Sequence, residues 1–249
     1  MKIRKIIFLI IAVLLVILGV TVKKTYLKKD EENNVNTVVA PEELEDKEIK
    51  VVTELEKIDI RKYIESIYGS YIAIQDFADI NNADETWLWE NVRSNIISDE
   101  KTSYTYKELE EKTNELYGPN LTKTFPKDGS DFFIFNEDTN AYLVADFTLD
   151  WKEWFAIRQI REVDNLYYVE ILEFKEDFTG DDNKIKLQNK KGEVLNEFEQ
   201  PENNAEKTLK ELEIQEYVLK NEKKFSKKEI VLEKDEKENL LYVKACVSK

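Results

Sequence analysis

An uncharged apolar run at residues 6–22, IIFLIIAVLLVILGVTV, constrains this chain more than any other feature of its sequence. As an α-helix, which rises roughly 1.5 Å per residue, the run would cover about 26 Å. That length suits the hydrocarbon core of a bilayer when flanking lysines extend toward the headgroups. Basic residues do flank it, at Lys2, Arg4, Lys5, Lys23, Lys24, Lys28 and Lys29. The run therefore predicts one transmembrane helix, and the membrane is the first predicted partner of the chain.

A cleavable export signal is the competing interpretation, because such a signal has the same basic head and apolar centre. The exit from the run, GVTVKKTYLKK, contains no convincing small-x-small cleavage site, and no cysteine follows the run for lipoprotein processing. We therefore expect an uncleaved signal-anchor. The positive-inside rule does not set its orientation, because basic residues on the two sides are balanced. The short basic head is typical of an export signal, which favours a cell-membrane protein with residues 1–5 inside and the bulk of the chain extracytoplasmic.

The charge of the remaining chain limits its partners. Residues 1–29 hold seven of the 37 basic residues and none of the 52 acids, which leaves a formal charge of −22 beyond them. Binding of DNA or RNA needs clustered lysine and arginine that displace counterions, so we predict no nucleic-acid partner. The negative field favours cations and basic partners instead. Hydrophobic residues at 42% and aromatic residues at 11% predict a folded core.

Histidine is absent from the chain, and cysteine occurs once. The chain therefore lacks the usual general base, the usual zinc ligand and every Ser/His or Cys/His nucleophile pair. An intramolecular disulfide is impossible, and we interpret Cys246 as a small apolar residue in a final strand. Hydrolases that use paired carboxylates or Ser/Lys survive these exclusions. Because no phosphate-binding glycine-rich loop, P-loop lysine or dinucleotide fingerprint occurs, we predict no cofactor.

The distribution of polar and apolar residues predicts five segments. They are a short cytoplasmic tail (1–5), the anchor (6–22), a flexible tether (23–41), an α+β domain (42–176) and an extension or second small domain (177–249).

Three helices are expected at the start of the α+β domain. Apolar residues spaced by four and three predict a first helix of about five turns. They are Ile60, Ile64, Ile67, Tyr71, Ile74 and Ala78. A second helix is expected over residues 85–97. The third begins at a capping box formed by Thr105 and Glu108 and ends at Gly118-Pro119.

Strand patterns follow the helices. They cover residues 132–135, 141–149, 154–163 and 166–174, with a two-residue hairpin turn at Asp164-Asn165. A hairpin around residues 189–192, a Lys/Glu-rich helix over residues 205–220 and two further strands complete the chain. This order predicts an α+β fold in which helices pack on a curved antiparallel sheet, followed by a C-terminal helix and β-hairpins.

The element order over residues 60–176 resembles that of the cystatin- and NTF2-like folds. With a short inside tail, one membrane helix and an outside domain, the layout is similar to that of the membrane scaffold subunits of type IV secretion and conjugation machines. The resemblance is one of layout, so it implies a scaffold role and carries over no site residue.

Four tryptophans are the candidate ligand contacts: Trp87, Trp89, Trp151 and Trp154. Paired aromatic rings can form a platform for a sugar ring or a proline-rich peptide, but tryptophans at such positions more often fill a core.

Acidic residues supply two further candidate sites. Glu90 with Asp84 or Asp146 could form the carboxylate pair of a glycosidase. Oxygen ligands for calcium gather around Gly180, at Asp177, Asp181, Asp182 and Asn183. The alternating spacing of an EF-hand is missing there, so we predict no metal site.

We therefore expect a non-catalytic extracytoplasmic interaction or scaffold protein, with no catalytic residues and an unidentified protein partner. Two alternatives stay open. One is a module that binds cell-wall glycan or peptide through the tryptophans, and the other is a carboxylate-based hydrolase.

Overall fold

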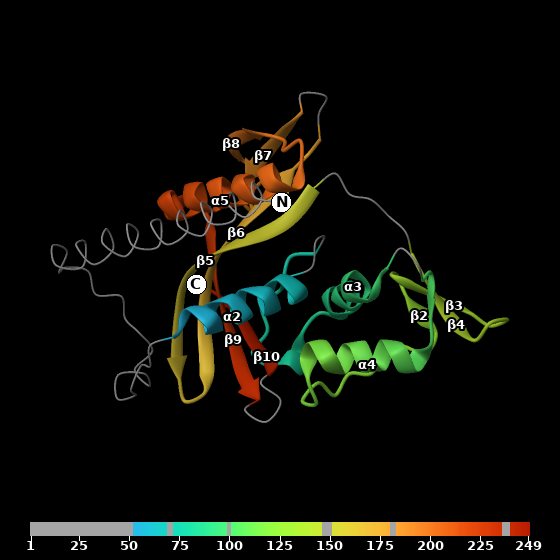
Figure 1. The fold of residues 1–249 in the computed structure, drawn as a ribbon. Helices are drawn as coiled ribbons and strands as arrows, with labels where there is room; N and C mark the ends of the chain where they lie inside the picture. The colour runs from blue at the N-terminus through green and yellow to red at the C-terminus, as the bar shows by residue number, and fades with distance from the viewer. Residues whose placement is uncertain (1–51, 69–71, 99–100, 146–150, 180–182, 236–239) are drawn as a thin grey trace, which may run out of the picture. The chain divides into compact units, whose positions relative to one another are not determined.

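The computed structural model describes residues 52–68, 72–98, 101–145, 151–179, 183–235 and 240–249, all within one compact unit, Lys47–Lys249 (Figure 1). Helices and antiparallel sheets build this part of the chain, which confirms the predicted α+β class. The predicted anchor at residues 6–22 and tether at residues 23–41 lie outside the described residues. Among the residues described, no helix is long and apolar enough to cross a membrane.

Helices α3 (Glu85–Ile96) and α4 (Tyr106–Tyr117) form where the sequence predicts them. Thr105 and Glu108 make the predicted capping box of α4, and Gly118 ends the helix with a φ of +73°. The capping box supplies partners for backbone amides that would otherwise have none in the first helical turn. The signals that fix these two helices are local in the sequence.

The first helix differs from its prediction. Helix α2 (Glu54–Ile67) begins earlier and ends at Ile67, so Ile74 lies outside it, while Tyr71 of the predicted stripe is not among the described residues. Contacts with the C-terminal strands hold the following segment. Lys228 donates a hydrogen bond to the carbonyl of Ile74, and Phe77 forms a backbone bridge with Cys246. Tertiary contacts therefore override the helical pattern here.

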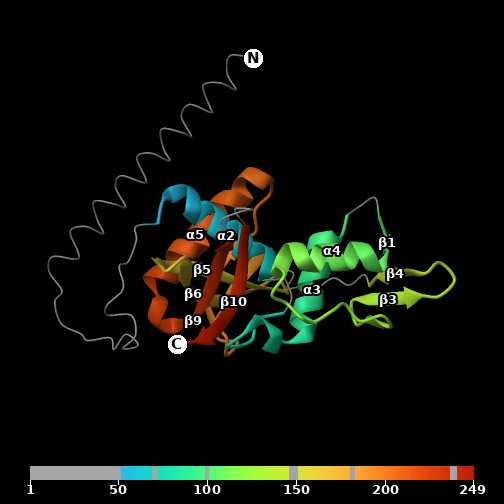
Figure 2. The ribbon, with the colours of Figure 1, turned by 90° about the horizontal axis from the view of Figure 1, so that it is seen from below.

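Four short strands form the smaller sheet, in the order β1-β4-β3-β2. They are β1 (Ser103–Tyr104), β2 (Gly129–Ser130), β3 (Phe133–Asn136) and β4 (Ala141–Val144). Helices α3 and α4 lie between this sheet and the larger one in both views (Figure 1 and Figure 2). Phe125 connects the small sheet to α3, because its ring packs edge-on against Trp89 and Phe133, each at 5.2 Å between ring centroids.

Six strands form the larger sheet, and β6 is the strand that joins its parts. The strands are β5 (Trp151–Val163), β6 (Leu166–Asp177), β7 (Lys184–Gln188), β8 (Val194–Glu199), β9 (Ser226–Asp235) and β10 (Leu240–Ser248). β5 pairs along one edge of β6 through the predicted turn at Asp164-Asn165, where both residues have positive φ. On its other edge β6 pairs with β9 as far as Glu173 and with β7 from Lys175 onward.

The strands that were predicted to form one curved antiparallel sheet are thus divided over two sheets. β3 and β4 pair with β1 and β2, whereas β5 and β6 belong to the sheet that also contains β7 to β10. The predicted boundary between residues 176 and 177 falls inside β6, and the larger sheet contains strands from both sides of it. The domain boundaries proposed from composition stay predictions.

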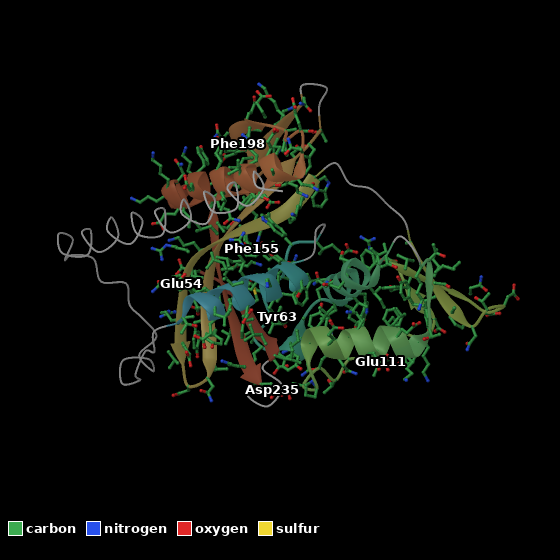
Figure 3. All side chains as sticks on the ribbon, in the orientation of Figure 1. Glu54, Tyr63, Glu111, Phe155, Phe198 and Asp235 are labelled. Atoms are coloured by element: carbon green, nitrogen blue, oxygen red, sulfur yellow. The ribbon has the colours of Figure 1, made fainter. Side chains whose placement is uncertain are left out.

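The larger sheet carries a hydrophobic cluster on each face. Because alternate residues of a strand point to opposite faces, Val169 and Ile171 of β6 belong to the cluster with α2, α3 and α4, while Leu172 and Phe174 belong to the cluster with α5 (Asn204–Lys220). Figure 3 labels one side chain of each cluster, Phe155 near α2 and Phe198 near α5. The two faces therefore carry different helices on the same central strand.

Candidate functional site

Trp87 and Trp89 of α3 lie in the core, with 1% and 3% of their surface exposed. The Trp87 ring packs between Phe77 and Tyr117, at 5.6 and 5.7 Å between ring centroids. Both indole nitrogens are buried without a hydrogen-bond partner in the described part of the chain. These two rings stabilise the contact of α3 with its neighbours and present no surface to a ligand.

Trp151 and Trp154 of β5 are half-buried and do not form a platform together. Trp154 follows Trp151 by three positions along the strand, so their side chains point to opposite faces of the sheet. Each ring is covered by an ammonium group, Lys175 at 4.5 Å from the Trp151 ring centre and Lys152 at 3.3 Å from that of Trp154. The four candidate tryptophans therefore occupy three separate environments.

The carboxylates chosen as a candidate glycosidase pair hold local structure. Glu90 is fully buried, and its two oxygens accept hydrogen bonds from Arg93 at 2.8 and 2.9 Å. Asp84 caps α3 by accepting a hydrogen bond from the Trp87 amide at 3.0 Å. Asp146 lies outside the described residues. Glu90 and Asp84 are both engaged, and neither lines a cleft among those found in the described chain.

The candidate calcium ligands are described only in part. Asp177 accepts hydrogen bonds from the amide and hydroxyl of Thr179 at 2.8 and 2.6 Å and from Gln188 at 2.6 Å. Asp181 and Asp182 lie outside the described residues. Across the described ranges, no group of three or more acidic, cysteine or histidine side chains is arranged to hold a metal ion.

A cleft of about 360 Å³ opens where β5, β6 and the turn between β7 and β8 meet, and we name it the Glu173 cleft. It is lined by Ala73, Glu153, Glu173, Phe174, Lys175, Gln188, Asn189, Lys190, Lys191 and Gly192. The pairing of β6 explains its position. β6 leaves β9 at Glu173 and takes β7 as its neighbour from Lys175 onward, so the sheet is interrupted beside these two residues.

The side chains of Glu153 and Glu173 lie on the same face of the sheet. Glu153 pairs across the ladder with Lys175, and Phe155 pairs with Glu173. Alternate positions of paired strands share a face, so both glutamates and Lys175 lie on the face that carries Phe155 and the larger cluster. Glu173 follows buried Val169 and Ile171 at a spacing of two along the same strand. A charged residue at such an otherwise apolar position is the sequence signal that could have identified it.

Glu173 is a buried carboxylate at the base of a polar network, with 4% of its side chain exposed. Its Oε1 accepts a hydrogen bond from the Tyr68 hydroxyl at 3.0 Å and lies 3.6 Å from the Lys228 ammonium. Lys228, 1% exposed, also lies 3.2 Å from Asp76 Oδ1. Glu173 Oε2 is buried without a hydrogen-bond partner, and the Lys190 ammonium lies 3.5 Å from it.

Burial sets the protonation of the groups around Glu173. It raises the pKa of Tyr68 well above its ordinary value, an effect that the Glu173 charge reinforces, so the hydroxyl stays a donor. Burial also raises the pKa of Glu153. It raises the pKa of the Cys246 thiol to about 12, and this free cysteine is buried in β10 as the sequence predicts. The thiol is therefore protonated at neutral pH and is not a nucleophile.

A smaller cleft of about 320 Å³ lies beside the short 3-10 helix η2 (Ile80–Asn82). Its polar groups already bind one another. Asn81 donates to Asp79 at 2.9 Å and accepts from the Thr122 amide at 2.6 Å, while Lys244 pairs with Glu233 at 3.1 Å. The Glu173 cleft differs in that it retains a buried oxygen without a hydrogen bond.

Comparison of the chain with protein-family models, with curated proteins and with solved structures finds no match.

Proposed function

We propose that this chain is a single-pass, extracytoplasmic protein that binds a protein partner without catalysis, and that the Glu173 cleft receives a basic side chain of that partner. The observation that carries the proposal is Glu173 Oε2, a buried carboxylate oxygen that lines a cleft and has no hydrogen-bond partner. A buried polar atom without a hydrogen bond raises the free energy of the protein. A donor that binds this oxygen therefore forms a stronger interaction than the same donor would form at the surface.

A cation is the strongest donor for the free oxygen of Glu173. Glu153 supplies a second carboxylate on the same face, and the lining also holds Lys175, Lys190 and Lys191, so an incoming cation has to displace Lys190 from Glu173. Ammonium and guanidinium groups form the strongest hydrogen bonds to carboxylates. Lys190 stands nearest to this role within the chain, but its side chain is 56% exposed and lies 3.5 Å from Glu173 Oε2, beyond ideal hydrogen-bond length. A partner's cation can therefore replace it.

The same surroundings favour binding over chemistry. Lys228 and Tyr68 hold Glu173 from one side, and the Cys246 thiol beside them is protonated at neutral pH. Glu90, the buried glutamate considered for a hydrolytic pair, is engaged by Arg93 through both oxygens. These groups are arranged to fix a charge in place rather than to transfer a proton.

The membrane topology is part of this proposal. The apolar run at residues 6–22 supports a signal-anchor, and the polar stretch at residues 23–41 would tether the domain close to the bilayer. A cystatin- or NTF2-like layout of helices on a sheet, as in the membrane scaffold subunits of secretion and conjugation machines, would suit a protein that recruits partners. The proposed place of action is the outer side of the cell membrane.

Binding of a cell-wall glycan or peptide is a second candidate function, because Trp151 lies at the border of the cleft. Its half-buried ring is covered by Lys175, which lines the Glu173 cleft. A ligand that displaced Lys175 would gain an aromatic surface next to two carboxylates. A basic peptide fits that combination better than a neutral sugar.

The test compares two probes of nearly the same size and shape, the cationic N-acetyl-arginine amide and the neutral N-acetyl-citrulline amide, titrated into the full-length protein in nanodiscs. We expect the arginine probe to shift the NMR signals of the cleft and the citrulline probe to leave them unchanged. Glu153→Gln and Glu173→Gln should weaken the arginine probe by about tenfold or more, as expected for a desolvated charge pair. Glu111→Gln, at an exposed position of α4, is the matched control.

Lys190→Met adds an opposite expectation, because it removes the competing cation. This variant should bind the arginine probe more tightly than the natural protein does. Equal affinity in Glu153→Gln, Lys190→Met and Glu111→Gln would show that the cleft is not the site and would overturn the proposal.

A further inference from the structure

A second, larger cleft of about 650 Å³ adjoins the Glu173 cleft and shares Asn189, Lys190 and Lys191 with it. Its lining residues are Asn189, Lys190, Lys191, Glu193, Leu195, Lys223, Lys224, Phe225 and Ser226. They come from the turn and start of the β7–β8 hairpin and from the segment between α5 and β9, which includes the 3-10 helix η3 (Glu222–Lys224). We name it the lysine cleft.

The lining of the lysine cleft is mainly positive, although the chain around it is strongly negative. Its lining contains four lysines and one carboxylate, Glu193, in a chain whose formal charge beyond residue 29 is −22. Among the described residues, no carboxylate lies within ion-pair distance of Lys191, Lys223 or Lys224. Glu222, adjacent to Lys223 in sequence, is engaged by Arg158 at 2.5 Å, and Lys223 acts on its carboxylate beyond ion-pair distance. A concave surface that gathers like charges in this way has a high affinity for a counter-ion.

Ser226 supplies a second, independent observation. Ser226 lines the cleft, and its Oγ is buried without a hydrogen-bond partner in the described structure. A serine hydroxyl can donate to an anion, and a buried hydroxyl without a partner is unfavourable until something binds it. Phe225, 6% exposed, and Leu195 give the same cleft an apolar lining that strengthens electrostatic attraction.

The composition of the lining is compatible with a phosphate. Lysine ammonium groups bind phosphate oxygens as rotatable point charges, without the fixed geometry that an arginine guanidinium imposes on carboxylate and phosphate alike. The lining contains four lysines and no arginine, so several of these charges can meet the oxygens of one phosphate. The volume of the cleft is that of a small-molecule site, so a phosphate joined to a polyol fits better than the bare ion.

We propose that the lysine cleft binds a phosphate group carried on a small polyol, with Lys191, Lys223 and Lys224 neutralising its charge and Ser226 donating a hydrogen bond to one oxygen. Free polyol phosphates and the headgroup of a phosphoglycerol lipid share this chemistry. Of the residues proposed to hold the phosphate, Lys223, Lys224 and Ser226 do not line the Glu173 cleft, although Lys190 and Lys191 line both clefts.

The experiment titrates glycerol 1-phosphate, with glycerol as the uncharged control, into the full-length protein held in phosphatidylcholine nanodiscs. A second arm measures binding of the same protein to vesicles with and without phosphatidylglycerol. We expect glycerol 1-phosphate to bind, glycerol to fail, and affinity to fall as salt rises. If the soluble probe binds, the ligand of the cleft is a free polyol phosphate. If the protein binds only to vesicles that contain phosphatidylglycerol, the ligand is the lipid headgroup.

The variants separate the cleft from general charge effects. Lys223→Gln/Lys224→Gln should weaken phosphate binding by about tenfold or more, equivalent to about 1.4 kcal/mol. Lys62→Gln/Lys220→Gln changes the net charge equally at exposed helical positions and should leave binding unchanged. Ser226→Ala should weaken it by a smaller factor. Equal weakening in both double variants, or no preference for phosphate in either arm, would overturn the proposal.

Failure of this proposal would be distinct from failure of cation binding in the Glu173 cleft. Glu153→Gln should lose the arginine probe and keep glycerol 1-phosphate, while Lys223→Gln/Lys224→Gln should do the reverse.

Discussion

The ammonium of Lys228 lies 3.6 Å from Oε1 of Glu173, and the two side chains are 1% and 4% exposed. They join β9 to β6 on the face that carries α2, α3 and α4. Lys228 also donates to the carbonyl of Ile74, so the pair ties the segment after α2 to the sheet. One ion pair thus supports both the base of the Glu173 cleft and the packing of the chain around it.

Lys228→Met should destabilise the protein by about 3–5 kcal/mol, because it leaves the Glu173 charge buried without its partner. Urea unfolding followed by tryptophan fluorescence measures the change. In the double variant Lys228→Met/Glu173→Gln the loss should be smaller than the sum of the two single losses. Lys227→Gln, whose ion pairs are 3.9 Å long and partly exposed, is the control and should change stability little. Equal effects at residues 227 and 228 would contradict the prediction.

Trp87→Ala should cost about 3–5 kcal/mol, because a large side chain is removed from a closed core. Trp151→Ala removes a half-buried ring and should cost much less. The two free energies of unfolding come from urea titrations of otherwise identical proteins. If Trp151→Ala proved the more damaging of the two, the assignment of Trp87 to the core and of Trp151 to the border of the cleft would be wrong.

The raised pKa of Glu176 predicts how the stability of the protein depends on pH. Glu176 is 7% exposed, and burial raises its pKa to about 7, with Lys152 of β5 and Lys207 and Glu211 of α5 as the charged groups around it. The folded state therefore holds a proton that the unfolded state releases near pH 4.5, so stability falls as pH rises from about 5 to 8. A shift of this size corresponds to about 3 kcal/mol.

Glu176→Gln should flatten this part of the stability profile, measured by urea unfolding between pH 5 and 8. The carboxyls of Glu56 and Glu108, whose pKa values are lowered to about 2 by hydrogen bonds and by Lys101 at Glu108, contribute stability above pH 4.5 and lose it below. Their effect therefore lies outside the measured window. A variant that kept the full slope would show that another group carries it.

Two glycines with positive φ make a matched pair. A Cβ at Gly118 would lie 2.7 Å from the Tyr242 ring, whereas a Cβ at Gly192 would meet nothing. Both substitutions to alanine strain the backbone, by about 1 kcal/mol at Gly192 and by about 1–3 kcal/mol at Gly118, whose ψ of −178° lies in a region that is essentially restricted to glycine. Gly118→Ala should cost more by the displacement of Tyr242, about 1–3 kcal/mol in addition. Thermal unfolding of both variants gives the difference, and equal melting temperatures would contradict the clash.

Sequence patterns predict the elements whose signals are local. The capping box of Thr105 and Glu108 and the turn residue Gly118 define α4, and Asp164-Asn165 defines the β5–β6 hairpin, because each signal lies within a few residues of the structure it causes. The end of α2 and the division into two sheets were not predictable in this way. They depend on pairings between residues far apart, such as Phe77 with Cys246.

The Glu173 cleft was missed for the same reason. Its cause is the change of the neighbour of β6 from β9 to β7, which no local pattern shows. The tryptophans and acids chosen from the sequence were residues of suitable chemistry without a known environment. Glu173 and Lys228 could have been singled out only as charges at apolar positions of two strands, and their pairing required the register between those strands.

The position of β6 between early and late strands sets the order in which the chain can fold. β5 and β6 can pair as soon as both have left the ribosome, but the second edge of β6 must wait for β9, which begins at Ser226. The larger core also needs Cys246, close to the end of the chain. During synthesis the β5–β6 hairpin therefore presents an unpaired edge and an apolar face, a state prone to aggregation. Production of this protein therefore requires that a chaperone protects the β5–β6 hairpin or that the rest of the chain is completed rapidly.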